Sequence, residues 1–253
     1  MGHVHCQDCD LSTLCIPLGL DDKEIGYLDS IIRRNRKVKK KSILFHAGEP
    51  CHSLYAVRSG SVKTIVVTAD GDEMVTGFFL PGELFGLEGL ANGEYQCTAV
   101  ALEDSGFCQL PLRHLDRLVG EMTPLRNRLM GLMGKQISEN QSMMVLLGSR
   151  HAEERLASFL LGLILRYRRY NDIHDEIELS MPREDIANYL GLTTETVSRL
   201  MTRFREEGVV DYRGRRLFIR DVAALRERVS LCNGKYSDRS TISSIKEKPI
   251  PEK

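Results

Sequence analysis

The feature that most constrains the fold is a change in hydrophobic period near the middle of the chain. Between Lys41 and Leu112, short apolar runs alternate with turn sequences rich in Gly, Asp and Asn. Closely spaced strands with such turns indicate a small β-sandwich or β-barrel. From about Leu125 to Gly148 the apolar residues recur every three to four positions, which is the helical period. The sequence therefore predicts an α+β chain in which a β unit is followed by helices.

The predicted long helix carries a seam of apolar residues at spacings of 3, 4, 3, 4 and 3. A heptad seam is typical of a helix that packs against a partner helix, and a polar residue within it sets the register of the pair. A buried helix without a partner is the competing interpretation. The seam consists of Met130, Met133, Ile137, Asn140, Met144 and Leu147. A second apolar face, expected to rest on the helix's own domain, consists of Leu129, Leu132, Met143, Val145 and Leu146.

Composition excludes several broad classes of protein. The 253 residues include 35 Lys plus Arg and 35 Asp plus Glu, so the formal net charge is zero and DNA binding by bulk charge is excluded. No apolar run is long enough to span a membrane, and Met1 to His5 lack the pattern of a signal peptide. We therefore expect a cytoplasmic protein with no membrane partner, whose cysteines stay reduced.

Three of the seven cysteines, Cys6, Cys9 and Cys15, lie close together at the N-terminus. An arm this short cannot bury a core of its own, so bound metal is a better explanation for its order than packing. Three thiolates leave one position of a tetrahedral ion or a cubane cluster for a distant fourth cysteine. Zinc, with His3 or His5 as spare ligands, an iron–sulfur cluster, and a flexible terminus with incidental thiols all remain open from spacing alone.

A helix–turn–helix pattern occupies the second half of the chain. A helix is predicted from Pro182 to Leu190, and Gly191 permits a tight turn after it. Thr193 is a suitable N-cap for a second helix, which is expected to run from Thr194 to Glu207. One face of this second helix is apolar and is expected to anchor it to the domain through Val197, Leu200, Met201 and Phe204.

The opposite face of the second helix is suited to reading DNA. Glu195, Ser198 and Arg199 supply the groups that hydrogen-bond base edges in the major groove. From Arg199 to Arg220 there are seven arginines against three acidic residues, a local excess on a neutral chain. The stretch from Asp211 to Ile219 is predicted to form a β-hairpin wing whose arginines contact phosphates. The predicted DNA-binding residues are Thr194, Glu195, Thr196, Ser198, Arg199, Arg213 and Arg215.

This order of elements resembles the CRP/FNR family of bacterial transcription regulators, and within it the fumarate-and-nitrate-reduction type. The sequence segments that match the family are His5-Cys6-Gln7-Asp8-Cys9, Ser53-Leu54-Tyr55-Ala56-Val57, Gly71-Asp72-Glu73, Ala152-Glu153-Glu154-Arg155-Leu156-Ala157 and Asn188-Tyr189-Leu190-Gly191-Leu192. The resemblance implies a cysteine arm (1–17), a β-roll sensor domain like cyclic-nucleotide-binding domains (18–120), a dimerisation helix (121–149) and a winged helix–turn–helix domain (150–230). A disordered tail is expected at 231–253.

The resemblance further implies an oxygen-responsive homodimer. In this family a [4Fe-4S] cluster is held by cysteines that correspond to Cys6, Cys9, Cys15 and Cys108. The cluster favours the DNA-binding dimer, and oxygen converts or destroys it and releases DNA. Glu195, Ser198 and Arg199 match the family's recognition residues, and the dimer is expected to read an inverted repeat of TTGAT-like half-sites. Contact with RNA polymerase is also implied.

Two other regulators and an enzyme are the alternatives. A relative sensing another ligand would share the architecture, but no cyclic nucleotide is expected, because no arginine lies between Arg58 and Arg113 to bind its phosphate. A zinc-stabilised DNA-binding protein would use the cysteine arm to bind a zinc ion instead of an iron–sulfur cluster. An enzyme is not expected: the histidines are dispersed, and the Gly-rich segment at Pro81 lacks the strand–loop–helix context of a phosphate-binding loop.

Overall fold

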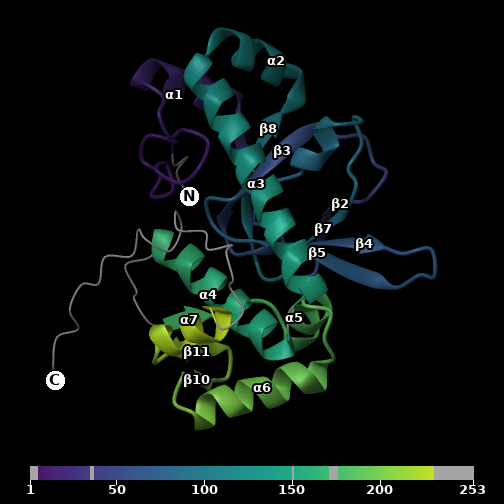
Figure 1. Ribbon diagram of the computed structural model, residues 1–253. Helices are drawn as coiled ribbons and strands as arrows, with labels where there is room; N and C mark the ends of the chain where they lie inside the picture. The colour runs from purple at the N-terminus through teal and green to yellow at the C-terminus, as the bar shows by residue number, and fades with distance from the viewer. Residues whose placement is uncertain (1–4, 35–36, 150, 171–175, 231–253) are drawn as a thin grey trace, which may run out of the picture.

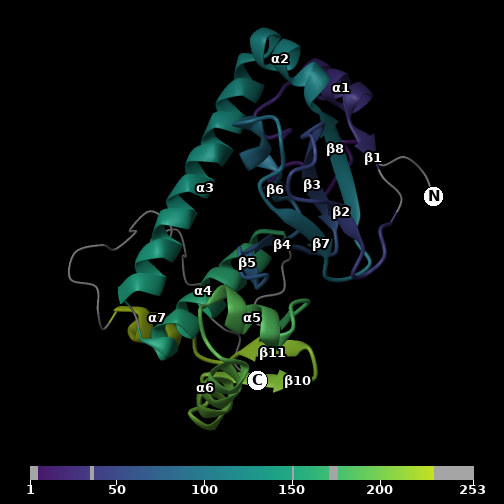
Figure 2. The same cartoon turned by 90° about the vertical axis from the view of Figure 1, so that its right-hand side faces the viewer.

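The computed structural model describes residues 5–34, 37–149, 151–170 and 176–230. The N-terminal half forms a β-roll, a long helix runs along one side of it, and the C-terminal half forms a second, mainly helical unit (Figures 1 and 2). Within the described ranges, no helix combines the length and apolar character needed to cross a bilayer. The predicted tail, residues 231–253, lies outside the described residues.

The roll consists of two four-stranded antiparallel sheets, which agrees with the small β-sandwich or β-barrel predicted from the strand pattern. One sheet has the order β1-β8-β3-β6 and the other the order β2-β7-β4-β5. The strands are β1 (Arg33–Arg34), β2 (Ile43–Phe45), β3 (Ser53–Ser59), β4 (Val62–Val67), β5 (Glu73–Phe79), β6 (Leu84–Phe85), β7 (Thr98–Ala101) and β8 (Gly106–Pro111). A short 3-10 helix, η1 (Leu87–Leu90), follows β6.

Aromatic rings fill the space between the two sheets. The rings of Phe45 and Tyr95 stack with centroids 3.7 Å apart, and Phe85 and Phe107 are fully buried beside them. The Tyr95 hydroxyl donates a 2.7 Å hydrogen bond to the carbonyl oxygen of Ser53. The interior of the roll is therefore a packed core built from aromatic side chains.

Apolar residues at helical spacing predict a first helix from Leu18 to Arg33, and the helix that forms is shorter. α1 (Asp22–Ile31) starts later because Asp21 caps it: the Asp21 carboxylate accepts from the Glu24 amide, and the Glu24 carboxylate accepts from the Asp21 amide. It ends where Ile32 adopts an extended conformation and the chain enters β1.

Two helices follow the roll, α2 (Leu112–Glu121) and α3 (Thr123–Ser149). Leu125 and Leu129 at the start of α3 are buried against the roll, together with Leu118 of α2. Further along, α3 leaves the roll and extends to the start of α4 in the second unit (Figure 2). The long helix predicted from Leu125 to Gly148 is confirmed.

The C-terminal unit is a winged helix–turn–helix. It consists of α4 (Ala152–Tyr170), β9 (Glu176–Glu178), α5 (Arg183–Tyr189), α6 (Thr194–Glu206), β10 (Val210–Arg213), β11 (Arg216–Ile219) and α7 (Val222–Ser230). The three strands form one sheet in the order β10-β11-β9. The predicted wing is confirmed, whereas β9 was not predicted, because its three residues form a strand only through pairing with β11.

The second unit packs directly on the roll. The ring of Phe78 on β5 contacts the rings of Phe159 on α4 and Tyr189 on α5, with centroid distances of 6.0 Å and 5.1 Å. The side-chain amide of Asn188 bonds the exposed edge of β5, accepting from the Val75 amide at 2.7 Å and donating to the Glu73 carbonyl at 2.7 Å. One hydrophobic core therefore extends from the roll into the helix–turn–helix unit.

Two ion pairs join the same two units. Lys63 on β4 pairs with Asp185 on α5 at 2.6 Å. Glu83, in the turn before β6, accepts a 2.8 Å hydrogen bond from Nε of Arg166 on α4 and also pairs with its Nη2. The Arg166 guanidinium lowers the pKa of Glu83 against the opposing effect of burial. Because these side chains are largely shielded, the pairs fix the orientation of the second unit on the roll.

Candidate nucleic-acid interface and metal centre

Local chemistry explains the geometry of the helix–turn–helix. Gly191 has φ +60°, a left-handed conformation that glycine adopts without steric cost, so α5 and α6 meet in a tight turn. Oγ1 of Thr193 accepts a 3.1 Å hydrogen bond from the Thr196 amide and caps α6 as predicted. The four apolar residues predicted to anchor α6 are all buried: Val197, Leu200, Met201 and Phe204.

The N-terminal half of α6 presents its predicted DNA-reading face to solvent. Thr194, Glu195 and Arg199 are exposed, and Thr196 and Ser198 are half-buried. Figure 1 shows α6 on the outer surface of the second unit, away from the roll. The structure therefore leaves the predicted residues accessible on one side of a helix that is anchored on the other.

Arg183, Arg205 and Tyr212 belong to the same surface and were missed from sequence. Nη1 of Arg183 lies 3.4 Å from Oγ of Ser198, and the Arg183 and Arg205 guanidiniums lie over the Tyr212 ring at 5.2 Å and 4.9 Å. A hydrogen bond from Thr202 and these two cations lower the pKa of Tyr212. The available signal was an arginine in the first turn of α5, where backbone-contacting residues of such motifs lie.

The arginines of the wing divide into two groups. Arg215 donates to the carbonyl oxygens of Leu179 at 3.0 Å and Ser180 at 3.1 Å, so its guanidinium holds the wing to the chain after β9. Arg216 pairs with Glu176 at 3.3 Å. Arg213, at the turn of the hairpin, is exposed. The wing thus has a more structural role than the sequence predicted, with Arg213 placed at its outer edge.

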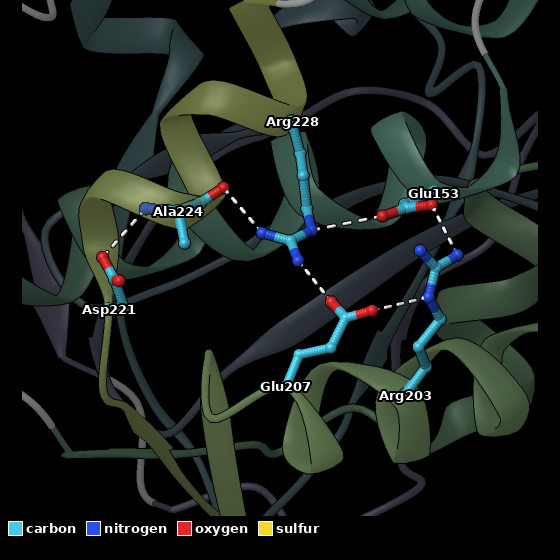
Figure 3. Close-up of polar contacts among 6 residues, drawn as sticks. All are labelled: Glu153, Arg203, Glu207, Asp221, Ala224 and Arg228. Carbon is cyan, nitrogen blue, oxygen red and sulfur yellow. Dashed lines mark hydrogen bonds and ion pairs between the residues drawn. The ribbon is translucent and has the colours of Figure 1, made fainter.

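An ion-pair network fixes the C-terminal half of α6 (Figure 3). Arg203 pairs with Glu153 on α4 at 2.9 Å and with Glu207 at 2.7 Å. Arg228 on α7 pairs with the same two carboxylates, reaching Glu153 at 3.2 Å. Because two cations and two anions alternate across three helices, α6 cannot turn relative to α4 without breaking several contacts.

A single arginine connects the end of α3 to the turn of the helix–turn–helix. Arg155 on α4 donates from Nη2 to the Leu147 carbonyl oxygen at 2.8 Å and from Nη1 to the Leu190 carbonyl oxygen at 3.1 Å. The Leu147 side chain also borders this turn, with Cδ2 3.7 Å from where a Cβ on Gly191 would lie. A movement of the end of α3 would therefore displace the turn that precedes α6.

The predicted seam lies mainly in solvent. Met130, Ile137 and Met144 are 66%, 58% and 72% exposed. Asn140 is exposed, and Met133 and Leu147 are half-buried. The assignment of Val145 to the inner face was wrong: it is 58% exposed, because α3 has left the roll at that point. Exposed apolar residues at heptad spacing form a surface suited to a second copy of the helix.

The cysteine arm folds against the roll close to Cys108. Cys6 is buried, and Cys15 and Cys108 pack against the same apolar cluster, which includes Ile16 and Leu110. Cys108 lies on β8, paired with Arg34 on β1 and Ala56 on β3. Two thiols of the arm and the thiol of Cys108 thus lie around one part of the roll.

Charged side chains anchor both ends of the arm. The Cys6 amide donates a 2.8 Å hydrogen bond to Asp29, which in turn pairs with Arg34. At the other end, Nε of Arg128 on α3 donates to the Cys15 carbonyl oxygen at 3.1 Å. The arm is therefore tied to α1 and β1 on one side and to α3, the helix that carries the heptad seam, on the other.

Each of the three arm thiols lies close enough to Cys108 for their charges to interact. Burial raises the pKa of Cys6 to about 12, with further contributions from Asp29 and Cys108. Burial likewise raises the pKa of Cys15 to about 12, and Cys108 and Cys9 add to the rise. Among the described residues, no three His, Cys, Asp or Glu side chains lie close enough to hold a single metal ion.

Cys51 and Cys97 belong to a different part of the roll. Both are buried in the aromatic core with Phe45 and Tyr95. Sγ of Cys97 lies 3.1 Å from a carboxylate oxygen of Glu88. Cys97 therefore packs in a different cluster from the one that contains Cys6 and Cys108.

Family models and relatives agree with this architecture. A Crp-like helix-turn-helix domain matches residues 154–228, and a cyclic nucleotide-binding domain matches residues 35–121. Among solved structures, FixK2 from Bradyrhizobium japonicum is similar, with a TM-score of 0.70 and 28% identity over 78% of this chain and 96% of that one.

Curated relatives include proteins named as anaerobic regulators and as fumarate and nitrate reduction regulators. The chain is 44% identical to the "Anaerobic regulatory protein" of Pasteurella multocida (strain Pm70) over 88% of this chain and 82% of that protein. It is 43% identical to the "Fumarate and nitrate reduction regulatory protein" of Escherichia coli (strain K12), covering 88% and 90%. It is 43% identical to the "Transcriptional activator protein anr" of Pseudomonas aeruginosa, covering 87% and 91%. The chain belongs to the CRP/FNR family of transcription regulators, in the branch of the fumarate and nitrate reduction and anaerobic regulators.

Proposed function

We propose that this protein is an oxygen-responsive transcription regulator that binds a [4Fe-4S] cluster through Cys6, Cys9, Cys15 and Cys108. The observation that carries the proposal is the packing of the arm against β8, which brings its cysteines and Cys108 into mutual electrostatic contact. These positions come from parts of the chain more than ninety residues apart in sequence.

The donor set fits a cubane cluster better than a single zinc ion. A cubane distributes four thiolates over four iron atoms, so its ligands stand farther apart than the four ligands of one tetrahedral ion. Arg34 and Arg128 lie beside the arm and supply positive charge that offsets the thiolates.

The arm and α3 are joined by chemistry that explains how ligand binding would affect dimerisation. Arg128 contacts the backbone of Leu14 and Cys15 and lies two positions before the exposed seam residue Met130. When bound, the cluster supplies an oxygen-labile tie between arm and β8. With the arm in place, Arg128 holds the first half of α3, and the seam from Met130 to Leu147 meets its counterpart in a homodimer.

The DNA-reading role follows from α6 and the surfaces beside it. We infer that Arg199 reads guanine, Glu195 reads cytosine and Ser198 contacts a base edge. Thr194 and Thr196 at the start of α6, and Arg213 at the outer edge of the wing, position the duplex through its backbone. Arg215 supports this contact by holding the wing in place. Because two copies are related by a two-fold axis, the target is an inverted repeat of TTGAT-like half-sites about one helical turn apart. Contact with RNA polymerase is part of the same proposal.

A cyclic nucleotide is not the proposed ligand. In this chain Glu83 bonds Arg166, and stacked rings occupy the interior of the roll. Anaerobic purification with iron and sulfide analysis tests the proposal. About four iron and four sulfide per chain, with absorbance near 400 nm, are expected. One zinc per chain and a colourless preparation would instead favour the zinc-stabilised alternative.

A further inference from the structure

A cavity of about 330 Å³ lies where the cysteine arm, the roll and the DNA-binding unit meet. Its walls come from the arm at Leu14 and Leu18, from β5 at Thr76, from α3 at Leu132 and from α4 at Arg169. The cavity is found where α3 leaves the roll and approaches α4 (Figure 2). Pockets near this size hold compact small molecules, and the DNA-reading surface does not include this one.

The cavity is separate from the interior of the roll. Phe45, Tyr95 and Cys97 pack together between the two sheets, and none of these three residues borders the cavity. Glu83 lies in the wall, but its carboxylate already pairs with Arg166. A ligand in this cavity would therefore sit outside the roll, between β5 and α3.

The charges on the cavity wall do not cancel. Besides the pair at Glu83, Lys135 and Glu139 of α3 form a second neutral pair at 3.4 Å. Within the described residues, the lining contains no further carboxylate. Arg128 donates to backbone carbonyl oxygens, and Arg169 forms no ion pair with any part of the chain that the structure describes. An excess of guanidinium charge around a cavity favours an anionic ligand.

The rest of the wall divides into a polar and an apolar part. Tyr189 contributes a phenol whose pKa is raised by burial, so its hydroxyl stays protonated and can donate a hydrogen bond. Gln136 and Asn140 of α3 add two amides. The apolar part includes Leu18, which is 43% exposed, and Leu132. This combination suits a ligand with an anionic head and a short apolar body.

We propose that the cavity binds a small amphipathic organic anion, whose head pairs with Arg169 and whose apolar body packs on Leu18 and Leu132. Such an occupant contacts the arm, α3 and α4 together. A ligand that touches all three segments binds their docked arrangement more tightly than one in which they separate, so it stabilises the arm against α3. The proposal involves neither the cysteine thiols nor α6, and it goes beyond the function proposed above.

Calorimetry on the full-length protein prepared without oxygen tests the site with octanoate, octyl phosphate and octanamide. The first two probes carry an anionic head, and octanamide is an uncharged match for octanoate. The test variant is Arg169→Gln, which keeps a polar side chain at an exposed position of α4. The matched control is Arg113→Gln, which removes an exposed arginine of α2 that does not line the cavity.

We expect one saturable octanoate site per chain. Arg169→Gln should weaken octanoate binding about ten-fold or more, because a charge-assisted pair is lost, and the control should bind as wild type does. Octanamide should bind wild type about ten-fold more weakly than octanoate for the same reason. Saturable binding of octyl phosphate alone would identify the head as a phosphate. Equal binding to wild type and Arg169→Gln, or binding of neither anion, would overturn the inference.

Hydrogen exchange shows where the probe sits. Octanoate should slow amide exchange in residues 11–18 of the arm and 128–140 of α3, because the occupant bridges these segments. The slowing should be smaller in Arg169→Gln at the same octanoate concentration. Calorimetric binding without a change in either segment would place octanoate elsewhere on the protein and contradict the proposal.

Discussion

Nε of Arg166 lies 2.8 Å from Oε1 of Glu83, so an ion pair joins α4 of the DNA-binding unit to the turn before β6 of the roll. The same turn, Gly82-Glu83-Leu84, lies within residues 35–121, which match a cyclic nucleotide-binding domain. Here its carboxylate instead stabilises the docking of one domain on the other. The contact spans 83 positions in sequence and ties α4 directly to the roll.

Breaking this pair should destabilise the protein in a pH-dependent way. Glu83→Gln leaves the Arg166 charge without its partner. Because both side chains are about a quarter exposed, we expect the free energy of unfolding at pH 7 to fall by about 3 kcal/mol, the lower end of the range for broken buried ion pairs. The folded-state pKa of Glu83 is lowered from 4.5, so the pair stabilises the fold above that pH and the contribution is lost as pH falls through the lowered pKa.

Urea unfolding of wild type and Glu83→Gln between pH 3 and pH 7 measures this difference. The two curves should converge as the pH falls below about 4.5. Glu49→Gln, an exposed carboxylate on the same roll, is the control and should follow wild type throughout. A constant gap between wild type and Glu83→Gln across the range would show that the carboxylate's charge is not what stabilises the contact.

The contacts of Arg155 predict a variant that dimerises but binds DNA poorly. Arg155→Lys keeps the positive charge, but an ammonium cannot reproduce the planar fork that reaches Leu147 and Leu190 together. Losing one such hydrogen bond costs about 1 kcal/mol, so operator affinity should fall about five- to ten-fold. Sedimentation should show an unchanged dimer, as for the control Arg126→Lys. A parallel loss of dimer would mean that Arg155 supports α3 instead of the helix–turn–helix.

The two arginines proposed for base and backbone contact should behave differently. Arg199→Ala should reduce discrimination between operator and mutated operator, by about 1–3 kcal/mol for each contacted base pair. Arg213→Ala should weaken binding to all duplexes equally and lower the slope of log K against log salt by about 0.9 for each protomer, about 1.8 for the dimer. Competition titrations with matched and mismatched duplexes separate the two effects. If Arg199→Ala weakens every duplex alike, α6 does not read bases through this side chain.

Local signals in the sequence predicted the helix–turn–helix well. Gly191, the Thr193 cap and the apolar face through Phe204 each act within one turn or one helix, so their consequences are visible without a fold. The same is true of the roll, whose strands are separated by glycine turns.

Contacts between distant segments were not predictable in this way. Asn188 forms a hydrogen bond with an edge strand 113 positions earlier, and no pattern in either segment of the sequence predicts the contact. The half-buried position of Leu147 follows from the turn at Gly191, which depends on how α4 folds back on α3. Arg215 is likewise held by carbonyl oxygens that follow β9, and a strand of three residues has no recognisable pattern in the sequence.

The fourth cysteine ligand is tested by a matched pair of variants. Cys108 packs in the cluster that contains Cys6 and Cys15, whereas Cys97 lies in the aromatic core beside Glu88. Cys108→Ala should therefore abolish visible absorbance in anaerobic preparations, and Cys97→Ala should leave it unchanged. The reverse pattern would reassign the ligand to Cys97. Circular dichroism on both variants checks that neither has lost its fold.

The most direct test of the central claim measures dimerisation and operator binding on one anaerobic sample before and after exposure to air. We expect a dimer that binds the inverted repeat without oxygen, and a shift toward monomer with loss of binding and of absorbance near 400 nm in air. A protein that stays dimeric and binds its operator equally well after the absorbance has gone would contradict the account.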